Sequence, residues 1–218
     1  MSHGTPGRRT LPAVTDDGPL SAGRFSDWLD TMRRALHGDG GSDVPCDGCT
    51  ACCRSRQFVH VMPDEHGALS RIPTALLFPA PHLPPGNLLM GYDERGCCPM
   101  LGDHGCTIYD DRPRACRTYD CRVYAATGVD VDLDKPAVAE RVARWRFDFT
   151  SDADEPAHAA VRSAVAYLGA HGPELGDARP VHETEMAVMA VELVDLFRDG
   201  ATPTAEEVRA AAARLTAT

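Results

Sequence analysis

Nine cysteines lie between positions 46 and 121, and no cysteine lies outside this window. Four of them fall in the eight-residue stretch Cys-Asp-Gly-Cys-Thr-Ala-Cys-Cys that begins at Cys46. The other five are Cys97, Cys98, Cys106, Cys116 and Cys121. Thiolates are good ligands for zinc, for iron and for iron–sulfur clusters. The clustering of all nine thiols therefore predicts one module whose chemistry depends on bound metal or on disulfides.

The start of the chain favours metal over disulfides. Its first 20 residues are polar and rich in Gly and Pro, without the apolar segment of a secretory signal. No apolar run approaches the ~20 residues needed to span a bilayer. We therefore expect a cytoplasmic protein without a membrane partner, in which thiols stay reduced. Nine is also an odd number, so the cysteines of one chain cannot all pair.

Composition sets the size and the partners of the fold. The 218 residues, 43% of them hydrophobic, suffice for one ordinary domain, or for a small module beside a helical unit. The net charge of −10 argues against binding to nucleic acid or to an anionic membrane. We expect a redox partner or another protein partner that the sequence does not specify.

The adjacent pairs of cysteines indicate more than one point of coordination. In a helical turn, Cys52 and Cys53 are rotated by about 100° from one another, and in an extended segment they point to opposite sides. Neither geometry aims both thiols at one small ion. We expect two metal centres or one multinuclear cluster. Eight thiolates fill two four-coordinate sites and leave one cysteine spare.

Two metal chemistries fit the spacing. Zinc sites usually contain two separate C-x2-C pairs, whereas the pairs Cys46/Cys49 and Cys49/Cys52 overlap. Iron–sulfur sites favour C-x2-C-x2-C with a distant cysteine that precedes proline, and Cys98-Pro99 supplies that feature. An iron–sulfur cluster, such as a four-iron cluster, or iron is the first prediction, and zinc is the alternative.

Nearby arginines are candidates for balancing the charge. Four thiolates on a divalent zinc, or on an oxidised four-iron cluster, leave about two negative charges per centre. Arg112 and Arg117 each lie beside a turn that carries a cysteine, and we expect them to contact the bound cofactor. His104, between Cys98 and Cys106, could be a ligand, but a lone histidine between glycines is more often exposed.

These motifs resemble the CxxCxxCC, or YkgJ-like, cysteine-cluster family, which is described as chelating zinc or iron. The residues that carry the resemblance are the run from Cys46 to Cys53, then Cys98-Pro99-Met100-Leu101, then the stretch from Cys106 to Tyr119. The resemblance covers about Val44 to Tyr124. It implies eight metal ligands, which are Cys46, Cys49, Cys52, Cys53, Cys98, Cys106, Cys116 and, more loosely, Cys121. Cys97 departs from the pattern. A related module in flagellin lysine methylases is associated with an iron–sulfur cluster, which favours iron without transferring that activity.

Hydrophobic periodicity predicts an α+β fold that is mainly α. We expect a disordered leader over 1–21, an N-terminal helix and linker over 22–43, a cysteine module over 44–124, and a helical region over 134–216. The module is irregular, with short strands at 57–62, 87–92 and 106–109, and it packs against the N-terminal and C-terminal helices.

Particular residues carry these helix predictions. Phe25 and Trp28 are expected to pack the first helix over the cysteine module. An apolar stripe of Val138, Val142, Trp145 and Phe149 predicts one C-terminal helix. Thr204 with Glu207 predicts a capping box at the start of the last.

Three functions remain open. The first is an iron–sulfur or iron protein that acts in electron transfer or as part of a modifying enzyme. The second is a structural zinc module, and the third is metal storage or delivery. The sequence contains no H-E-x-x-H or G-x-S-x-G motif and no S-adenosylmethionine loop, so a conventional hydrolase or transferase is disfavoured. Whether the chain is an enzyme stays open.

Overall fold

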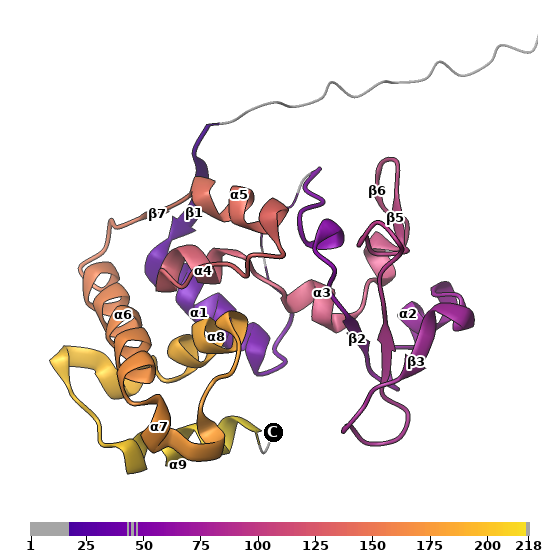
Figure 1. Cartoon of the computed structure of the whole chain (residues 1–218). Helices are drawn as coiled ribbons and strands as arrows, with labels where there is room; N and C mark the ends of the chain where they lie inside the picture. Colours follow the sequence, from indigo (N-terminus) through magenta and orange to yellow (C-terminus); the bar gives the residue numbers. More distant parts are fainter. Residues whose placement is uncertain (1–17, 43, 45, 47, 217–218) are drawn as a thin grey trace, which may run out of the picture.

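The structure is a computed structural model that describes residues 18–42, 44, 46 and 48–216. The fold is α+β and mainly α, as the sequence predicts. Figure 1 shows helices gathered on one side and short strands on the other, with α3 (Arg114–Thr118) between them. We call residues 18–42 and 120–216 the helical lobe, and residues 48–119 the cysteine lobe. No helix of the described residues is long and apolar enough to cross a membrane.

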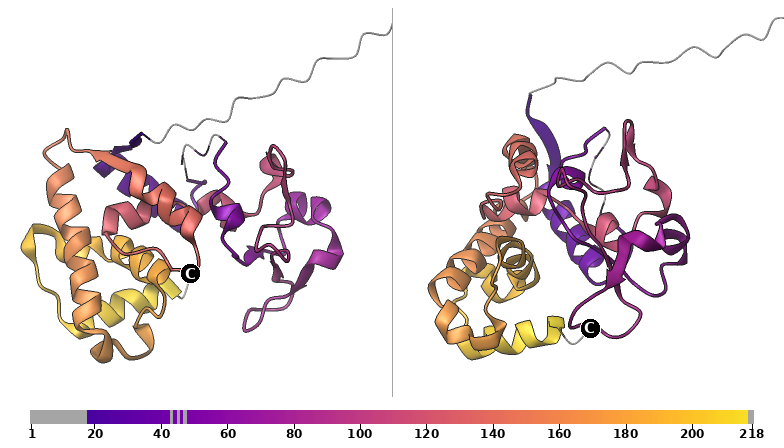
Figure 2. Two further views of the ribbon diagram at one scale, coloured as in Figure 1. Left: turned by 45° about the horizontal axis from the view of Figure 1, so that its top comes forward. Right: turned by 45° about the vertical axis from the view of Figure 1, so that its right-hand side comes forward.

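The helical lobe contains most of the regular structure. Its helices are α1 (Phe25–Leu36), α4 (Arg122–Thr127), α5 (Pro136–Arg144), α6 (Asp154–Ala170), α7 (Gly172–Leu175), α8 (Glu183–Glu192) and α9 (Ala205–Thr216). It also contains the strands β1 (Leu20–Arg24) and β7 (Trp145–Asp148) and the 3-10 segments η4 (Gly176–Ala178) and η5 (Val194–Gly200). The two further views in Figure 2 show α6 on the side away from the cysteine lobe.

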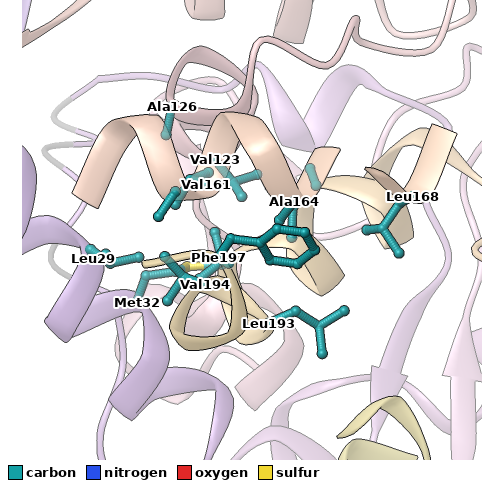
Figure 3. Close-up of a cluster of buried hydrophobic side chains, with 14 of the residues drawn as sticks. Leu29, Met32, Val123, Ala126, Val161, Ala164, Leu168, Leu193, Val194 and Phe197 are labelled. Atoms are coloured by element: carbon teal, nitrogen blue, oxygen red, sulfur yellow. The ribbon is translucent and has the colours of Figure 1, made fainter. Parts of the chain in front are cut away.

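The core of the helical lobe forms where α1, α4, α6, α8 and η5 meet. Figure 3 shows the side chains from these elements, among them Leu29, Met32, Val123, Val161, Ala164, Val194 and Phe197. Small residues on α6, such as Ala160 and Ala164, are buried and let the neighbouring elements approach closely. Fully burying a Val, Leu or Phe side chain contributes about 1.5–3 kcal/mol, so this core stabilises the lobe without metal.

Helix α1 matches its sequence pattern, but it faces a different part of the protein than predicted. The ring of Phe25 lies 5.2 Å from that of Phe147 and 4.9 Å from that of His158, measured between centroids. The Nε1–H of Trp28 donates to Asp120 Oδ2 at 3.0 Å. Phe25 therefore packs inside the helical lobe, and not over the cysteine module. The aromatic rings of β7 and α6 offer it a fully buried site, where it is 0% exposed.

Two sequence predictions are corrected by the pairing of β1 with β7. The two strands are parallel, and Leu20 pairs with Trp145. The segment 1–21 was predicted to be a disordered leader, but β1 begins at Leu20; residues 1–17 lie outside the described residues. The apolar stripe predicted to continue one helix through Trp145 is interrupted, because α5 ends at Arg144. From Trp145 the residues alternate inward and outward, which is the period of a strand.

The cysteine lobe is built from short elements around a small core. They are η1 (Cys52–Arg54), β2 (Val59–Val61), α2 (His66–Arg71), η2 (Thr74–Leu76), β3 (Leu77–Pro79), β4 (Leu88–Met90), β5 (Leu101–Gly102), β6 (Gly105–Cys106), η3 (Tyr109–Asp111) and α3. Strand β4 pairs antiparallel with β2 on one side and β3 on the other. The buried apolar side chains are Val61, Ala68, Ile72, Met90 and Ile108. Five such residues are a small core for a lobe of this length.

Three boundaries differ from the predicted ones. The strand predicted over 106–109 ends at Cys106, because Asp111 N bonds Ile108 O at 2.9 Å and closes the turn η3. The cysteine module predicted to end at 124 ends near Asp120, since Val123 and Tyr124 are buried in the helical-lobe core. Within the region 134–216 that was predicted to be helical, α8 ends at Glu192, and the 3-10 segment η5 follows it.

Candidate metal centre

A cavity of about 230 Å³ lies where the two lobes meet, and eight of the nine cysteines line it. They are Cys46, Cys49, Cys52, Cys53, Cys98, Cys106, Cys116 and Cys121. These are the same eight residues that the family resemblance implies as ligands. The ninth, Cys97, is buried and is not among the described residues that line the cavity. The fold thus gathers thiols that are up to 75 positions apart in the sequence, the separation between residues 46 and 121.

A tight turn positions the first thiols. Gly48 has a φ of 67°, in the left-handed region that glycine adopts most easily. This turn lets Cys49 N donate to Cys46 O at 2.8 Å, which brings the two cysteines to the same side of the cavity. The chain then enters η1, which contains Cys52 and Cys53.

The remaining four thiols come from four separate segments. Cys98 N donates to Cys53 O at 2.7 Å, and this bond joins the segment before β5 to η1. Cys106 lies on β6, opposite Leu101 in the hairpin. Cys116 lies in the first turn of α3, where its N–H donates to Pro113 O at 2.8 Å. Cys121 is the N-cap residue of α4.

Electrostatic interactions between the thiols identify a first group. Burial, together with negative charge on Cys52 and Cys49, raises the pKa of Cys46 to about 11, and the charge of Arg141 opposes the rise. Burial likewise raises the pKa of Cys121 to about 12; a hydrogen bond from Trp145 opposes this, and the charges of Asp120, Cys46 and Cys49 add to it. We call Cys46, Cys49 and Cys121 the first thiol group.

A second thiol group consists of Cys98, Cys106 and Cys116. Burial raises the pKa of Cys116 to about 12, and negative charge on Cys52, Cys98 and Cys106 adds to this effect. The pKa of Cys98 is also raised, mainly by burial and in part by Cys106 and Cys52. Cys52 interacts with both groups.

Cys52 and Cys53 are also in contact with one another, and a hydrogen bond between their side chains and burial raise the pKa of Cys52. Without a cation nearby, this crowding of thiols therefore favours the protonated form. A coordinated metal ion reverses the effect and deprotonates its thiol ligands.

The thiols are of a chemical type that binds metal, but their positions in this structure would have to change for a metal to bind. Soft thiolate ligands suit zinc, iron and iron–sulfur clusters. The cavity far exceeds the roughly 10–15 Å³ that one water needs, so it has room for more than a single ion. No three Cys, His, Asp or Glu side chains among the described residues stand close enough together to hold a metal ion. Coordination would therefore require the thiols to come closer together than they stand in this structure.

Arg112 and Arg117 both line the cavity, and each also contacts residues other than the cysteines. The guanidinium of Arg112 stacks on the ring of Tyr109, 3.9 Å from its centroid, and its charge lowers the pKa of Cys116 slightly against the larger effect of burial. Arg117 donates to Arg112 O at 2.8 Å and lies 3.6 Å from Glu65 Oε1. The structure thus places one arginine charge near the second thiol group. His104 also lines the cavity.

Two residues beyond the cysteine module reach the first thiol group, and the sequence interpretation missed both. Trp145 Nε1–H donates to Cys121 Sγ at 3.3 Å. Arg141, one helical turn earlier on α5, lies over the Trp145 ring at 4.8 Å from its centroid. A short strand of alternating apolar and charged residues, Trp-Arg-Phe-Asp, was the available signal for the orientation of Trp145.

Comparison with protein-family models, with curated proteins and with solved structures finds no match to this chain. The relationship to the cysteine-cluster family therefore stays a prediction from the motifs.

Proposed function

We propose that this chain binds metal through eight cysteine thiolates around the cavity, and that it holds an iron–sulfur cluster or iron there. The segregation of the thiols supports this most strongly: eight line one cavity, and the ninth does not. Cysteines used only as small apolar residues would instead be distributed through the two hydrophobic cores. The proposal places the protein in a reducing compartment such as the cytoplasm, because thiols must stay reduced to bind metal.

The two thiol groups suggest two four-thiolate centres. The first group and the second group each contribute three thiols; Cys52 interacts with both groups, and Cys53 is in contact with Cys52. Because adjacent side chains point in different directions, each of these two cysteines can complete a different centre. Each of the eight cysteines then belongs to one of the two centres, and Cys97 binds no metal.

Charge balance defines what the neighbouring residues would do. A four-thiolate centre leaves about two negative charges in a half-buried site, and such charge needs compensation. Arg112 is placed to compensate the second thiol group, through Cys116, and Arg141 the first, through Cys46. A bound iron–sulfur cluster would supply one-electron transfer, either toward a redox protein partner or within a modifying enzyme.

A structural zinc site is the second candidate, and the small core of the cysteine lobe favours it. Among the residues that the structure describes, five are buried in that core: Val61, Ala68, Ile72, Met90 and Ile108. In small irregular modules, the free energy of metal binding replaces hydrophobic burial as the source of stability. In this case the metal would hold the cysteine lobe together and carry out no reaction.

The test is to purify the protein without air or chelators and to measure iron, zinc and acid-labile sulfide. An iron–sulfur protein is coloured, whereas a zinc protein is colourless. Replacing Cys49 with Ser should lower the metal content and destabilise the cysteine lobe. Cys97→Ser is the matched control, because it removes a thiol outside the cavity and should keep the wild-type metal content.

The same preparation distinguishes storage from a resident centre. A storage protein should release its metal readily to a competing chelator and remain folded. Wild-type protein that contains neither iron nor zinc, or Cys49→Ser protein with full metal content and an unchanged melting temperature, would refute the proposal.

A further inference from the structure

The only two tryptophans of the chain donate their indole N–H groups to consecutive residues. Trp28, on α1, donates to Asp120 Oδ2 at 3.0 Å, and Trp145, on β7, donates to Cys121 Sγ at 3.3 Å. Both indoles are buried, at 2% and 3% exposed. The helical lobe therefore holds the segment that enters the cavity by two bonds of the same kind, one to a carboxylate and one to a sulfur.

Cys121 lies at the boundary between the cavity and the hydrophobic core of the helical lobe. Its side chain lines the cavity, and it also packs against the hydrophobic core of the helical lobe. Trp145 belongs to the helical lobe and is not among the described residues that line the cavity, whereas Cys121 is. Its N–H therefore reaches the sulfur from a residue outside the cavity lining. Trp145 thus occupies the position of an outer partner to a metal ligand.

The chemistry of the bond depends on the charge of the sulfur. A neutral thiol is a weak acceptor, whereas a thiolate bound to metal carries negative charge and accepts a stronger hydrogen bond. In a buried site with a low local dielectric, this difference increases. Arg141 lies over the Trp145 ring and its charge also acts on Cys46, so the same face of the helical lobe carries a cation.

We propose that Trp145 is a positioning residue for the metal-bound Cys121 thiolate, and that with Arg141 it sets the affinity or reduction potential of the centre that contains the first thiol group. This inference rests on the proposed metal binding. It assigns a role to a part of the chain, residues 134–216, that lies outside the cysteine module. Partners of metal ligands typically change metal affinity by about 10–100-fold when they are removed, and hydrogen bonds to sulfur tune cluster potentials.

Trp145→Phe is the decisive variant, and Trp28→Phe is its matched control. Each keeps a buried aromatic ring and removes one indole N–H, but only Trp145 donates to a sulfur. In an iron–sulfur protein, Trp145→Phe should make the reduction potential more negative, because the reduced centre loses a hydrogen bond that stabilises its extra negative charge. Trp28→Phe should lower stability and leave the potential unchanged.

If the metal is zinc, the same pair of variants is compared after substitution with cobalt(II), whose thiolate complexes are coloured. Trp145→Phe should shift the sulfur-to-cobalt charge-transfer band and weaken metal affinity by about tenfold or more in competition with a chelator. Trp28→Phe should keep the wild-type band. The inference is overturned if fully loaded Trp145→Phe protein behaves like the wild type. For an iron–sulfur protein this means an equal reduction potential, and for a zinc protein an equal charge-transfer band and an equal metal affinity.

A measurement on the wild-type protein avoids dependence on how the variants fold. The two indole N–H groups give two resonances in a proton NMR spectrum. If the Trp28→Phe variant folds, the resonance that it lacks belongs to Trp28; otherwise, contacts with neighbouring protons assign the two resonances. Loading with zinc should shift the Trp145 resonance and leave that of Trp28 nearly unchanged. Equal shifts, or no shift of Trp145, refute the inference while metal binding itself stands. A wild-type protein that takes up no metal refutes the proposed function first, and the inference with it.

Discussion

The carboxylate of Asp120 and the guanidinium of Arg122 form a buried ion pair, with Oδ2 2.8 Å from Nη2. The same carboxylate accepts hydrogen bonds from Trp28 Nε1 at 3.0 Å and from Ser42 Oγ at 2.8 Å. Arg122 Nη1 donates to Ala22 O at 3.1 Å. This network joins β1, α1 and the segment after α1 to the start of α4, directly beside Cys121. It fixes one wall of the cavity to the rigid core of the helical lobe.

Arg122→Met should therefore destabilise the protein strongly. Removing one partner of a buried pair leaves an uncompensated charge, which costs about 3–5 kcal/mol. Unfolding by urea, followed by the fluorescence of the two tryptophans, measures the change in the free energy of unfolding. Arg71→Met is the matched control, because its ion pair with Asp111 is exposed and should contribute less than about 1 kcal/mol. Equal losses for the two variants would contradict the role of the buried network.

The division into two thiol groups predicts how metal content responds to single substitutions. Cys121→Ser removes a ligand from the first group, and Cys116→Ser removes one from the second. If each group forms its own centre, each variant should keep about half of the wild-type metal, and the double variant should keep almost none. Metal analysis of anaerobically purified protein measures this directly. Loss of all metal in either single variant would indicate one cluster that spans both groups.

Asp154 makes the stability of the helical lobe depend on pH in the acidic range. Burial alone would raise the pKa of this carboxyl, but hydrogen bonds from the side chain and backbone of Ser26 and from the N–H groups of Ser151 and Thr150 hold it at about 2. An aspartate in an unfolded chain titrates near about 3.9. Because the folded-state pKa is the lower of the two, the stabilisation is complete above about pH 4 and is lost as the pH falls toward 2.

Asp154→Asn should remove this part of the pH dependence. We expect the variant to melt at a lower temperature than the wild type at neutral pH, and the difference to shrink between about pH 4 and 2. Thermal melting across this range, on protein freed of metal, is the measurement. Asp152→Asn is the control for charge, since it removes an exposed carboxylate from the same turn. A constant difference between Asp154→Asn and wild type at every pH would show that another group dominates.

The sequence was sufficient to predict those elements that depend on a local pattern of residues. The apolar spacing from Phe25 to Leu36 predicts α1 within its observed bounds, because a 3.6-residue period needs no information from elsewhere in the chain. Thr204 and Glu207 form the predicted capping box, with Glu207 Oε2 2.8 Å from Thr204 N and Thr204 Oγ1 3.3 Å from Glu207 N. The eight cysteines that the resemblance implies as ligands also line one cavity, which shows their location and leaves metal binding a prediction.

The sequence was insufficient where pairing with a distant segment determines the local secondary structure. Trp145 continues the apolar spacing of Val138 and Val142, so the helical reading was reasonable. Strand pairing with Leu20, 125 positions earlier, overrides it (Figure 1). The orientation of Trp145 toward Cys121 follows from that pairing. No local pattern around Arg141 or Trp145 indicates that the helical lobe contributes to the candidate site.

The capping box at the start of α9 offers a local test of the helical lobe. Thr204→Ala removes the hydroxyl that accepts from Glu207 N and donates to Glu207 Oε2. Loss of an N-cap side chain costs about 1 kcal/mol, and we expect this loss in the free energy of unfolding. Thr204→Ser keeps the hydroxyl and should stay close to the wild type. Hydrogen exchange of the first amides of α9 should accelerate in the Ala variant alone, because the helix frays from its uncapped end. Equal exchange in the two variants would mean that packing against the rest of the lobe, and not the cap, holds the start of this helix.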